Sequence, residues 1–337
     1  MCGLRRGACD MKLLYLPLHA DEYPTGTLEA FCSAIGRENV RDFDYLPMAN
    51  HLSNGAINRM LLEEIRGWRP DVVHMQLQET GIISAETLAA IRRLEDPPLL
   101  TTWMGDCRVS VPPYAAAVSA QCDVVFVSSV GQIESYRSVI KRPVRYWQIA
   151  ADFARDFDFG GTPPQLPHIP AIVFSGRYYG PAFPDSHERL AVCRALASGL
   201  DFAVVGSGFP GDIPCLGEWP RCVQRWIYKQ ARLTIGVNNF NHIRLFYSER
   251  QVQAMASGTC HLCWRVPGLE TEFVDGYDCV MFESSDECVA LARRLLDDPV
   301  TCERIGRQGR ARVWNEHSWP VAVGQYLRMI REFKPLP

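Results

Sequence analysis

The sequence has no apolar run that approaches the ~20 residues a membrane-spanning helix needs. It also has no low-complexity tract and little charge imbalance, since 35 basic and 38 acidic residues leave a net charge of −3. A wholesale basic coat for nucleic acid or a membrane surface is therefore excluded, although local patches are not. The first ten residues lack the hydrophobic stretch of a signal peptide, so folded structure is expected from Met11 and no membrane span is expected.

Cysteine, by contrast, is abundant, but its odd count of 13 and scattered spacing do not form a disulfide framework. Such cysteines typically serve as small, buried hydrophobic residues in proteins of a reducing, cytoplasmic compartment. Cys260 and Cys263 have a spacing that could suggest zinc. On a strand, however, two residues three positions apart face opposite sides, so the thiols would diverge. We therefore expect no metal site.

Short apolar runs alternate with helix-like segments along the whole chain. The first half has strand-like runs at 12–17, 71–75, 98–103, 123–127 and 144–147, and the second half has them at 171–174, 202–205, 233–237 and 259–264. Strands that are apolar throughout and are separated by helices indicate a parallel sheet covered on both faces. The sequence therefore predicts an α/β fold of two doubly wound, Rossmann-like domains that face each other across a cleft.

A Gly- and Pro-rich stretch interrupts this alternation. We predict a first domain over 11–150, a linker over 151–169, a second domain over 170–318 and a closing helical segment, 319–337, that could cross back to the first domain. Ligands of such sheets bind in the loops after the strands. The Gly-x-Gly-x-x-Gly pattern of dinucleotide binding is missing after the first strand, which disfavours a nicotinamide cofactor.

The most informative stretch is residues 246–259, Phe-Tyr-Ser-Glu-Arg-Gln-Val-Gln-Ala-Met-Ala-Ser-Gly-Thr. Ser248 and Gln251 have the spacing of a capping box, which predicts a helix from Ser248. Arg250 would lie in its first turn, against the helix dipole, unless an anion compensates. From the spacing alone, an ordinary capped helix with a solvated arginine explains the pattern equally well.

The pattern Ser-x-Arg-x-x-x-Ala-Met-Ala-x-Gly at 248–258 resembles the donor domain of GT-B glycosyltransferases, above all the CgeB-like, spore-maturation group. Residues 268–273 and 276–282, and the tail segments 295–299, 304–310 and 316–319, are similar to that group as well. The resemblance is specific over about 171–330 and is weaker in the first half, where it depends on strand order and on Trp103-Met-Gly-Asp106. It implies a nucleotide-sugar donor, with a UDP-sugar expected, held mainly by the second domain, and an acceptor held mainly by the first.

For the donor, the resemblance implies that Gly176 and Arg177 meet the diphosphate together with Ser248, Glu249 and Arg250. The ribose and nucleoside would contact Gln253, Gly206, Ser207 and Asn238. Three positions depart from the family pattern: a lysine common in relatives is replaced by Ala182, and the two Glu positions of the retaining Glu-x7-Glu pattern are Leu245 and Gln253.

For the acceptor, the loops after the first-domain strands supply the candidates. Asp106 could be the general base of an inverting transfer, or could bind the acceptor, or could be a turn residue that bonds its own backbone. His19 is a second catalytic candidate, and Trp103, Asp21 and Arg108 are candidates for acceptor binding. Phage relatives in the group modify hydroxymethylated pyrimidines, so DNA is a candidate acceptor, and the basic stretch 137–145 could face it.

The predicted activity is transfer of a hexose from a nucleoside diphosphate to a hydroxyl, with no cofactor beyond the donor. Two alternatives remain open. A sugar-nucleotide isomerase or hydrolase on the same fold would consume the donor without an acceptor. A catalytically silent binding module would also fit the departures at Leu245 and Gln253.

Overall fold

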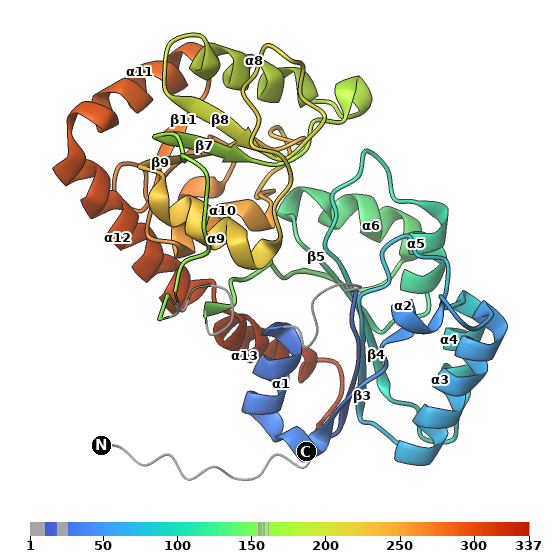
Figure 1. Ribbon diagram of the computed structural model, residues 1–337. Helices are drawn as coiled ribbons and strands as arrows, with labels where there is room; N and C mark the ends of the chain where they lie inside the picture. Colours follow the sequence, from blue (N-terminus) through green and yellow to red (C-terminus); the bar gives the residue numbers. More distant parts are fainter. Residues whose placement is uncertain (1–10, 19–25, 154–156, 158, 161, 337) are drawn as a thin grey trace. The chain divides into compact units, whose positions relative to one another are not determined.

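The computed structural model describes residues 11–18, 26–153, 157, 159–160 and 162–336. The chain divides into two compact units (Figure 1). One unit runs to Gln148 and includes the segment from Trp319 onward, and the other spans Ile149–Ser318. Residues 151–169, expected as a linker, group with the second unit, where Ala151 forms a parallel bridge with Ser318.

The first unit is built on a six-stranded parallel sheet in the order β2-β1-β3-β4-β5-β6. Its strands are β1 (Leu13–Leu16), β2 (Val40–Asp42), β3 (Val72–Met75), β4 (Leu99–Met104), β5 (Val124–Val127) and β6 (Val144–Tyr146). Its helices are α1 (Gly26–Ile35), α2 (Tyr45–Met48), α3 (Asn54–Trp68), α4 (Ala85–Arg92), α5 (Pro113–Ser119), α6 (Ile133–Ile140) and α13 (Trp319–Ile330).

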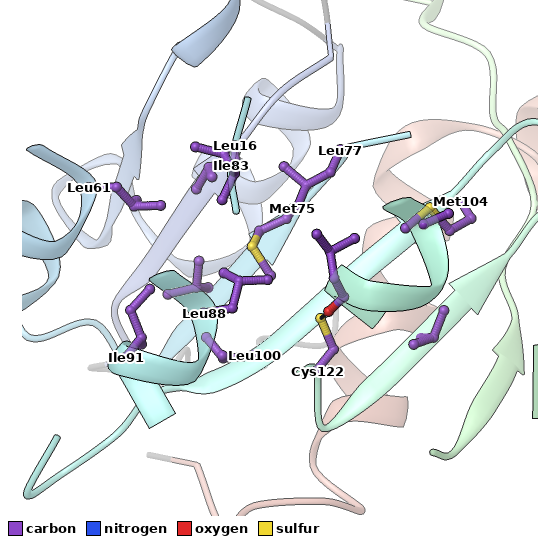
Figure 2. Close-up of a cluster of buried hydrophobic side chains, with 14 of the residues drawn as sticks. Leu16, Leu61, Met75, Leu77, Ile83, Leu88, Ile91, Leu100, Met104 and Cys122 are labelled. Atoms are coloured by element: carbon purple, nitrogen blue, oxygen red, sulfur yellow. Dashed lines mark hydrogen bonds between the residues drawn. The ribbon is translucent and has the colours of Figure 1, made fainter. Parts of the chain in front are cut away.

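Two sets of helices cover the two faces of this sheet. Alternate strand residues, among them Leu16, Met75 and Leu100, pack against α3 and α4 in the apolar core that Figure 2 shows. The opposite face is covered by α1 and α13 and is largely aromatic. There Tyr326 of α13 contacts the rings of His74 and Trp147, and its hydroxyl lies 2.7 Å from the Thr101 hydroxyl.

The second unit has a five-stranded parallel sheet in the order β11-β10-β9-β7-β8. Its strands are β7 (Ile172–Ser175), β8 (Phe202–Val205), β9 (Leu233–Gly236), β10 (Cys260–Trp264) and β11 (Val280–Phe282). Its helices are α8 (Ser186–Ala197), α9 (Arg221–Gln230), α10 (Glu249–Ala256), α11 (Ser285–Asp297) and α12 (Pro299–Glu316). The predicted α/β class with two Rossmann-like parallel sheets is confirmed.

Helices α8 and α11 pack on one face of the second sheet, and α9 and α10 pack on the other (Figure 1). Cys260 belongs to the core under α8, whereas Cys263 belongs to the core under α10. The two thiols therefore face opposite sides of β10, as the strand geometry predicted. Among the described helices, none combines the length and apolar character needed to cross a bilayer.

Candidate donor-binding site

In the second sheet, the direction in which successive strands are added reverses between β7 and β9, which are adjacent strands. From β7 the chain goes to β8 on one side, and it then returns to β9 on the other side of β7. Ligands of doubly wound sheets bind at the carboxyl ends of the strands at this switch point. The loops after β7 and β9, together with the first turns of α8 and α10, therefore form the candidate site.

Two arginines lie at this point. Arg250 occupies the first turn of α10, and its guanidinium carbon lies 5.9 Å from the centre of the Phe174 ring. Arg189 occupies the first turn of α8, and its guanidinium carbon lies 5.6 Å from the centre of the same ring. Both contacts are within the range of a cation–π interaction. Phe174, near the end of β7, thus brings the two cations together.

Arg189 is almost fully buried, with 1% of its surface exposed. Its Nη1 donates to the carbonyl of Arg177 at 2.8 Å, and its Nε donates to the carbonyl of Val237 at 3.1 Å. One carbonyl follows β7 and the other follows β9, so Arg189 bridges the switch point. Burial, together with the nearby positive charge of Arg250, lowers the pKa of Arg189 to about 9, which still leaves it protonated at neutral pH.

Within the described parts of the chain, neither Arg189 nor Arg250 forms an ion pair with a carboxylate. Burial lowers the pKa of Arg250 as well. Glu249, the acidic neighbour of Arg250, is instead paired with Arg221 at 2.6 Å. Two cations in the first turns of two helices oppose both helix dipoles, and a bound anion would compensate them. The site therefore has the electrostatic character of an anion pocket.

Arg177, expected as the principal phosphate ligand, has a different environment. Its exposed guanidinium pairs with Glu218 through Nη2 at 2.6 Å, and its Nε donates to the Ser207 hydroxyl at 3.0 Å. The Ser207 hydroxyl also bonds Glu218 at 2.5 Å. Hydrogen bonds from Ser207 and Arg177 lower the pKa of Glu218, so the carboxylate stays charged. The Arg177 side chain is therefore engaged by a carboxylate in this structure, and its role as a phosphate ligand stays a prediction.

The start of α10 also differs in detail from the expected capping box. Ser248 is the N-cap residue, but its side chain makes no capping hydrogen bond. Instead, its backbone N–H donates to the Oδ1 of Asn238 at 3.2 Å. Asn238, expected to contact the nucleoside, thus fixes the loop before α10. Gln253 is buried at 7% exposure, and its side chain makes no hydrogen bond to any described residue.

Gly176 and Gly206 allow a close backbone approach. A Cβ at Gly176 would lie 3.0 Å from the Phe174 ring, so a glycine there makes room for the ring that both arginines contact. A Cβ at Gly206 would lie 1.9 Å from the carbonyl oxygen of Gly176. The small size of Gly206 therefore serves the packing of two loops against each other, and contact of Gly206 with a nucleotide remains a prediction.

The candidate acceptor-site residues of the first unit lie in different environments. Asp106 lies in the exposed loop after β4 and pairs with Arg108 at 3.0 Å, and Arg108 also pairs with Glu79 at 3.2 Å. Trp103 is 5% exposed, and its Nε1 donates to the carbonyl of Trp147 at 2.9 Å, so its ring is part of the core instead of a binding surface. His19 and Asp21 lie outside the described residues.

Sequence reasoning missed Arg189 and Phe174. A signal for Arg189 was present, because it shares one helical face with the buried residues Val192, Cys193 and Leu196. A charged residue at an apolar position of a helix is costly unless it is compensated, so it marks a candidate functional group.

Comparisons with known proteins match one segment of the chain to a family and the whole chain to a fold. Residues 188–328, somewhat less than half of the chain, match the family model described as glycosyl transferase-like. This segment includes Arg189 and Arg250. The sequence has no match among curated proteins.

Several solved structures share the fold at low sequence identity. A glycosyltransferase from Rickettsia africae is 13% identical, with a TM-score of 0.65 over 96% of this chain and 99% of that one. Anabaena HepE in complex with UDP-glucose is 12% identical, with a TM-score of 0.62 over 96% and 100%. An E. coli trehalose-6-phosphate protein bound with UDP-2-fluoro glucose is 10% identical, with a TM-score of 0.63 over 97% and 99%. The segment 188–328 is thus similar to a glycosyl transferase-like family, and the chain shares the GT-B fold of these solved structures.

Proposed function

We propose that this protein transfers a sugar from a nucleoside diphosphate sugar, with a UDP-sugar as donor, to an acceptor hydroxyl. The observation that carries the proposal is the pair of arginines at the switch point, Arg189 and Arg250, which have no carboxylate partner among the described residues. The proposal is also supported by the UDP-sugars bound to HepE and to the E. coli protein, which share the fold.

The chemistry follows from the charge of the leaving group. When the bond between the sugar and the diphosphate breaks, negative charge develops on the departing phosphate oxygens. Cations and backbone N–H groups that are already in place stabilise this charge without reorganisation. Arg189, Arg250 and the N–H groups in the first turn of α10 would do so here, and Arg177 would join them if its pair with Glu218 opened.

In the first unit, Asp106 is the group that we propose as the general base for the acceptor hydroxyl in an inverting transfer. The acceptor itself is proposed only as a hydroxyl compound. DNA with hydroxymethylated pyrimidines belongs in the test because the motif at 248–258 resembles that of phage enzymes. The basic stretch that could face DNA is partly neutralised, since Arg137 pairs with Glu134 and Arg145 with Glu332.

The experiment is incubation of the protein with a panel of nucleotide sugars, with and without hydroxyl acceptors that include hydroxymethylated DNA. Donor consumption that requires an acceptor supports transfer. Consumption without acceptor would indicate an isomerase or hydrolase, and binding without consumption would indicate a silent binding module. A protein that neither binds nor consumes any donor would contradict the proposal.

A matched pair of variants connects the activity to the site. Arg250→Ala should weaken UDP binding by about 1.5–3 kcal/mol, the range for charged hydrogen bonds. Arg194→Ala is the control, because Arg194 is exposed and pairs with Asp212 away from the switch point. Equal UDP affinity in the two variants, measured by calorimetry, would remove Arg250 from the site.

A further inference from the structure

Arg189 has an unusual combination of burial and free hydrogen-bonding capacity. A guanidinium has five N–H donors. The Nε and Nη1 atoms of Arg189 bond the Val237 and Arg177 carbonyls, but Nη2 makes no hydrogen bond to any described residue. The side chain is nevertheless 99% buried by area, since only 1% of its surface is exposed. Nη2 itself is not fully enclosed, so a ligand or water can reach it and complete its hydrogen bonding.

The surroundings of Arg189 supply no counter-charge. Its backbone lies in the first turn of α8, where the helix dipole disfavours a cation. Its neighbour across the Phe174 ring is Arg250, a second cation. The nearby carboxylates have other partners: Asp185 accepts from His242, and Glu188 accepts from the Asn241 amide at 2.6 Å. A residue with only a packing role would not need to carry charge at such a position.

We propose that Arg189 is a positioning residue for the donor diphosphate, which holds the loops after β7 and β9 in register and presents its free Nη2 and its positive charge beside Arg250. This inference rests on the proposed function and extends it, because it assigns the anion pocket a buried second cation. The ligand class that completes the pocket is a pyrophosphate group, whose two phosphates match two adjacent guanidiniums.

The hydrogen bonds of Arg189 to two backbone carbonyls explain how it would hold the two loops in place. The loop after β7 carries Gly176 and Arg177, and the loop after β9 leads to α10 and Arg250. Because Arg189 bonds the backbone of both loops, its loss would let the two halves of the pocket shift independently. Arg189→Lys keeps the charge but cannot make the planar two-point contact, whereas Arg189→Met keeps the bulk and removes the charge.

The test measures binding of UDP and of inorganic pyrophosphate to the wild type, Arg189→Lys and Arg189→Met at low and moderate salt. The control is Arg194→Met on the exposed side of the same helix. We expect Arg189→Met to weaken both ligands at least ten-fold and to reduce the salt dependence of their affinity. We expect Arg189→Lys to recover part of the affinity, and the control to behave as the wild type.

Two further measurements distinguish a role of Arg189 in positioning the donor from a role in stabilising the fold. The rise in melting temperature produced by UDP should be lost in Arg189→Met and partly restored in Arg189→Lys. If the proposed transfer is assayed, the donor KM should rise ten-fold or more in Arg189→Met, and kcat should fall as well, because Arg189 also faces the charge that grows on the departing phosphate. If Arg189→Met does not fold, Arg189→Gln replaces it as the variant without charge and is compared with Arg189→Lys in the same measurements.

The outcomes distinguish the inference from the proposed function. A folded Arg189→Met or Arg189→Gln protein that binds UDP and pyrophosphate as tightly as the wild type would overturn the inference and leave the proposed function standing. A wild-type protein that binds neither ligand would overturn the proposed function itself.

Discussion

The buried guanidinium of Arg189 donates a hydrogen bond to the backbone carbonyl of Arg177, with 2.8 Å between Nη1 and the oxygen. The side chain of Arg177 meanwhile turns to Glu218 at the surface. The residue that the motif indicated as the phosphate ligand is thus fixed by its backbone, through a cation that the motif did not indicate. This arrangement leaves Arg177 available as an additional ligand only when its own ion pair opens.

The Arg177–Glu218 pair can be tested by removal of its acid. Glu218→Gln should raise UDP affinity a few-fold, because the freed guanidinium can turn toward the phosphates. The fold should change little in stability, since an exposed ion pair contributes only about 0–1 kcal/mol. Calorimetric titration of UDP and thermal unfolding check both statements. An affinity that falls in Glu218→Gln would show that the pair is needed for binding.

Asp106 and Glu79 offer a matched comparison in the first unit, because both carboxylates contact Arg108. Asp106→Asn should abolish sugar transfer and leave UDP binding unchanged if Asp106 is the base. Glu79→Gln, which also removes a charge from Arg108, should retain most of the activity. Rate assays with saturating donor decide the point. Comparable loss in both variants would assign the effect to Arg108 or to the loop instead.

The strands were predictable because buried parallel strands are continuous apolar runs, and runs such as 71–75 and 202–205 became β3 and β8. The edge strand β2 was missed, because only Val40 of its three residues is buried. Helix α3 was also missed, although Ser53 caps it and Ile57, Leu61 and Ile65 share its buried face. The hydrophobic signal of β2 is therefore a single residue, whereas α3 was readable from its spacing.

The site was predictable only where local sequence determines position. The location of Arg250 in the first turn of α10 followed from the residues around it. The partners of Arg177 and Ser248 depend on side chains far along the chain, Glu218 at 41 positions and Asn238 at ten. Such pairings are set by the folded sheet, and no local pattern encodes them.

Gly206 and Gly211 allow a test of the loop packing. Gly206→Ala would place a Cβ 1.9 Å from the Gly176 carbonyl oxygen, whereas a Cβ at Gly211 meets no atom within 4 Å. Gly206→Ala should destabilise the fold by about 1–3 kcal/mol or more, the cost of overpacking. Gly211→Ala should have a small effect. Denaturant unfolding of both variants provides the measurement, and equal stability would refute the close approach.

Two buried histidines predict a loss of stability in acid. Burial lowers the pKa of His74 to about 3, and burial together with Arg250 lowers the pKa of His261 to about 3. The unfolded chain takes up these protons near pH 6.5, so each histidine's contribution is complete above that pH. It declines as the pH falls toward 3, by up to about 1.4 kcal/mol per pH unit for each histidine.

The measurement is thermal unfolding between pH 7.5 and 4.5 for the wild type, His74→Gln and His261→Gln. Each variant should be less stable at pH 7.5, but its stability should fall less steeply with acid than that of the wild type. If stability falls equally steeply with pH in all three proteins, the buried histidines do not cause the loss of stability in acid.

The return of α13 to the first unit has a consequence for biosynthesis. The Trp147 indole donates to the carbonyl of Ala322, and the Tyr326 hydroxyl meets Thr101, so one face of the first sheet is covered by residues encoded after the whole second unit. The second unit is one uninterrupted segment and has all its strands once Ser318 has been translated. The second unit can therefore fold before the first unit is complete, and the first sheet keeps an aromatic face uncovered until α13 has been translated.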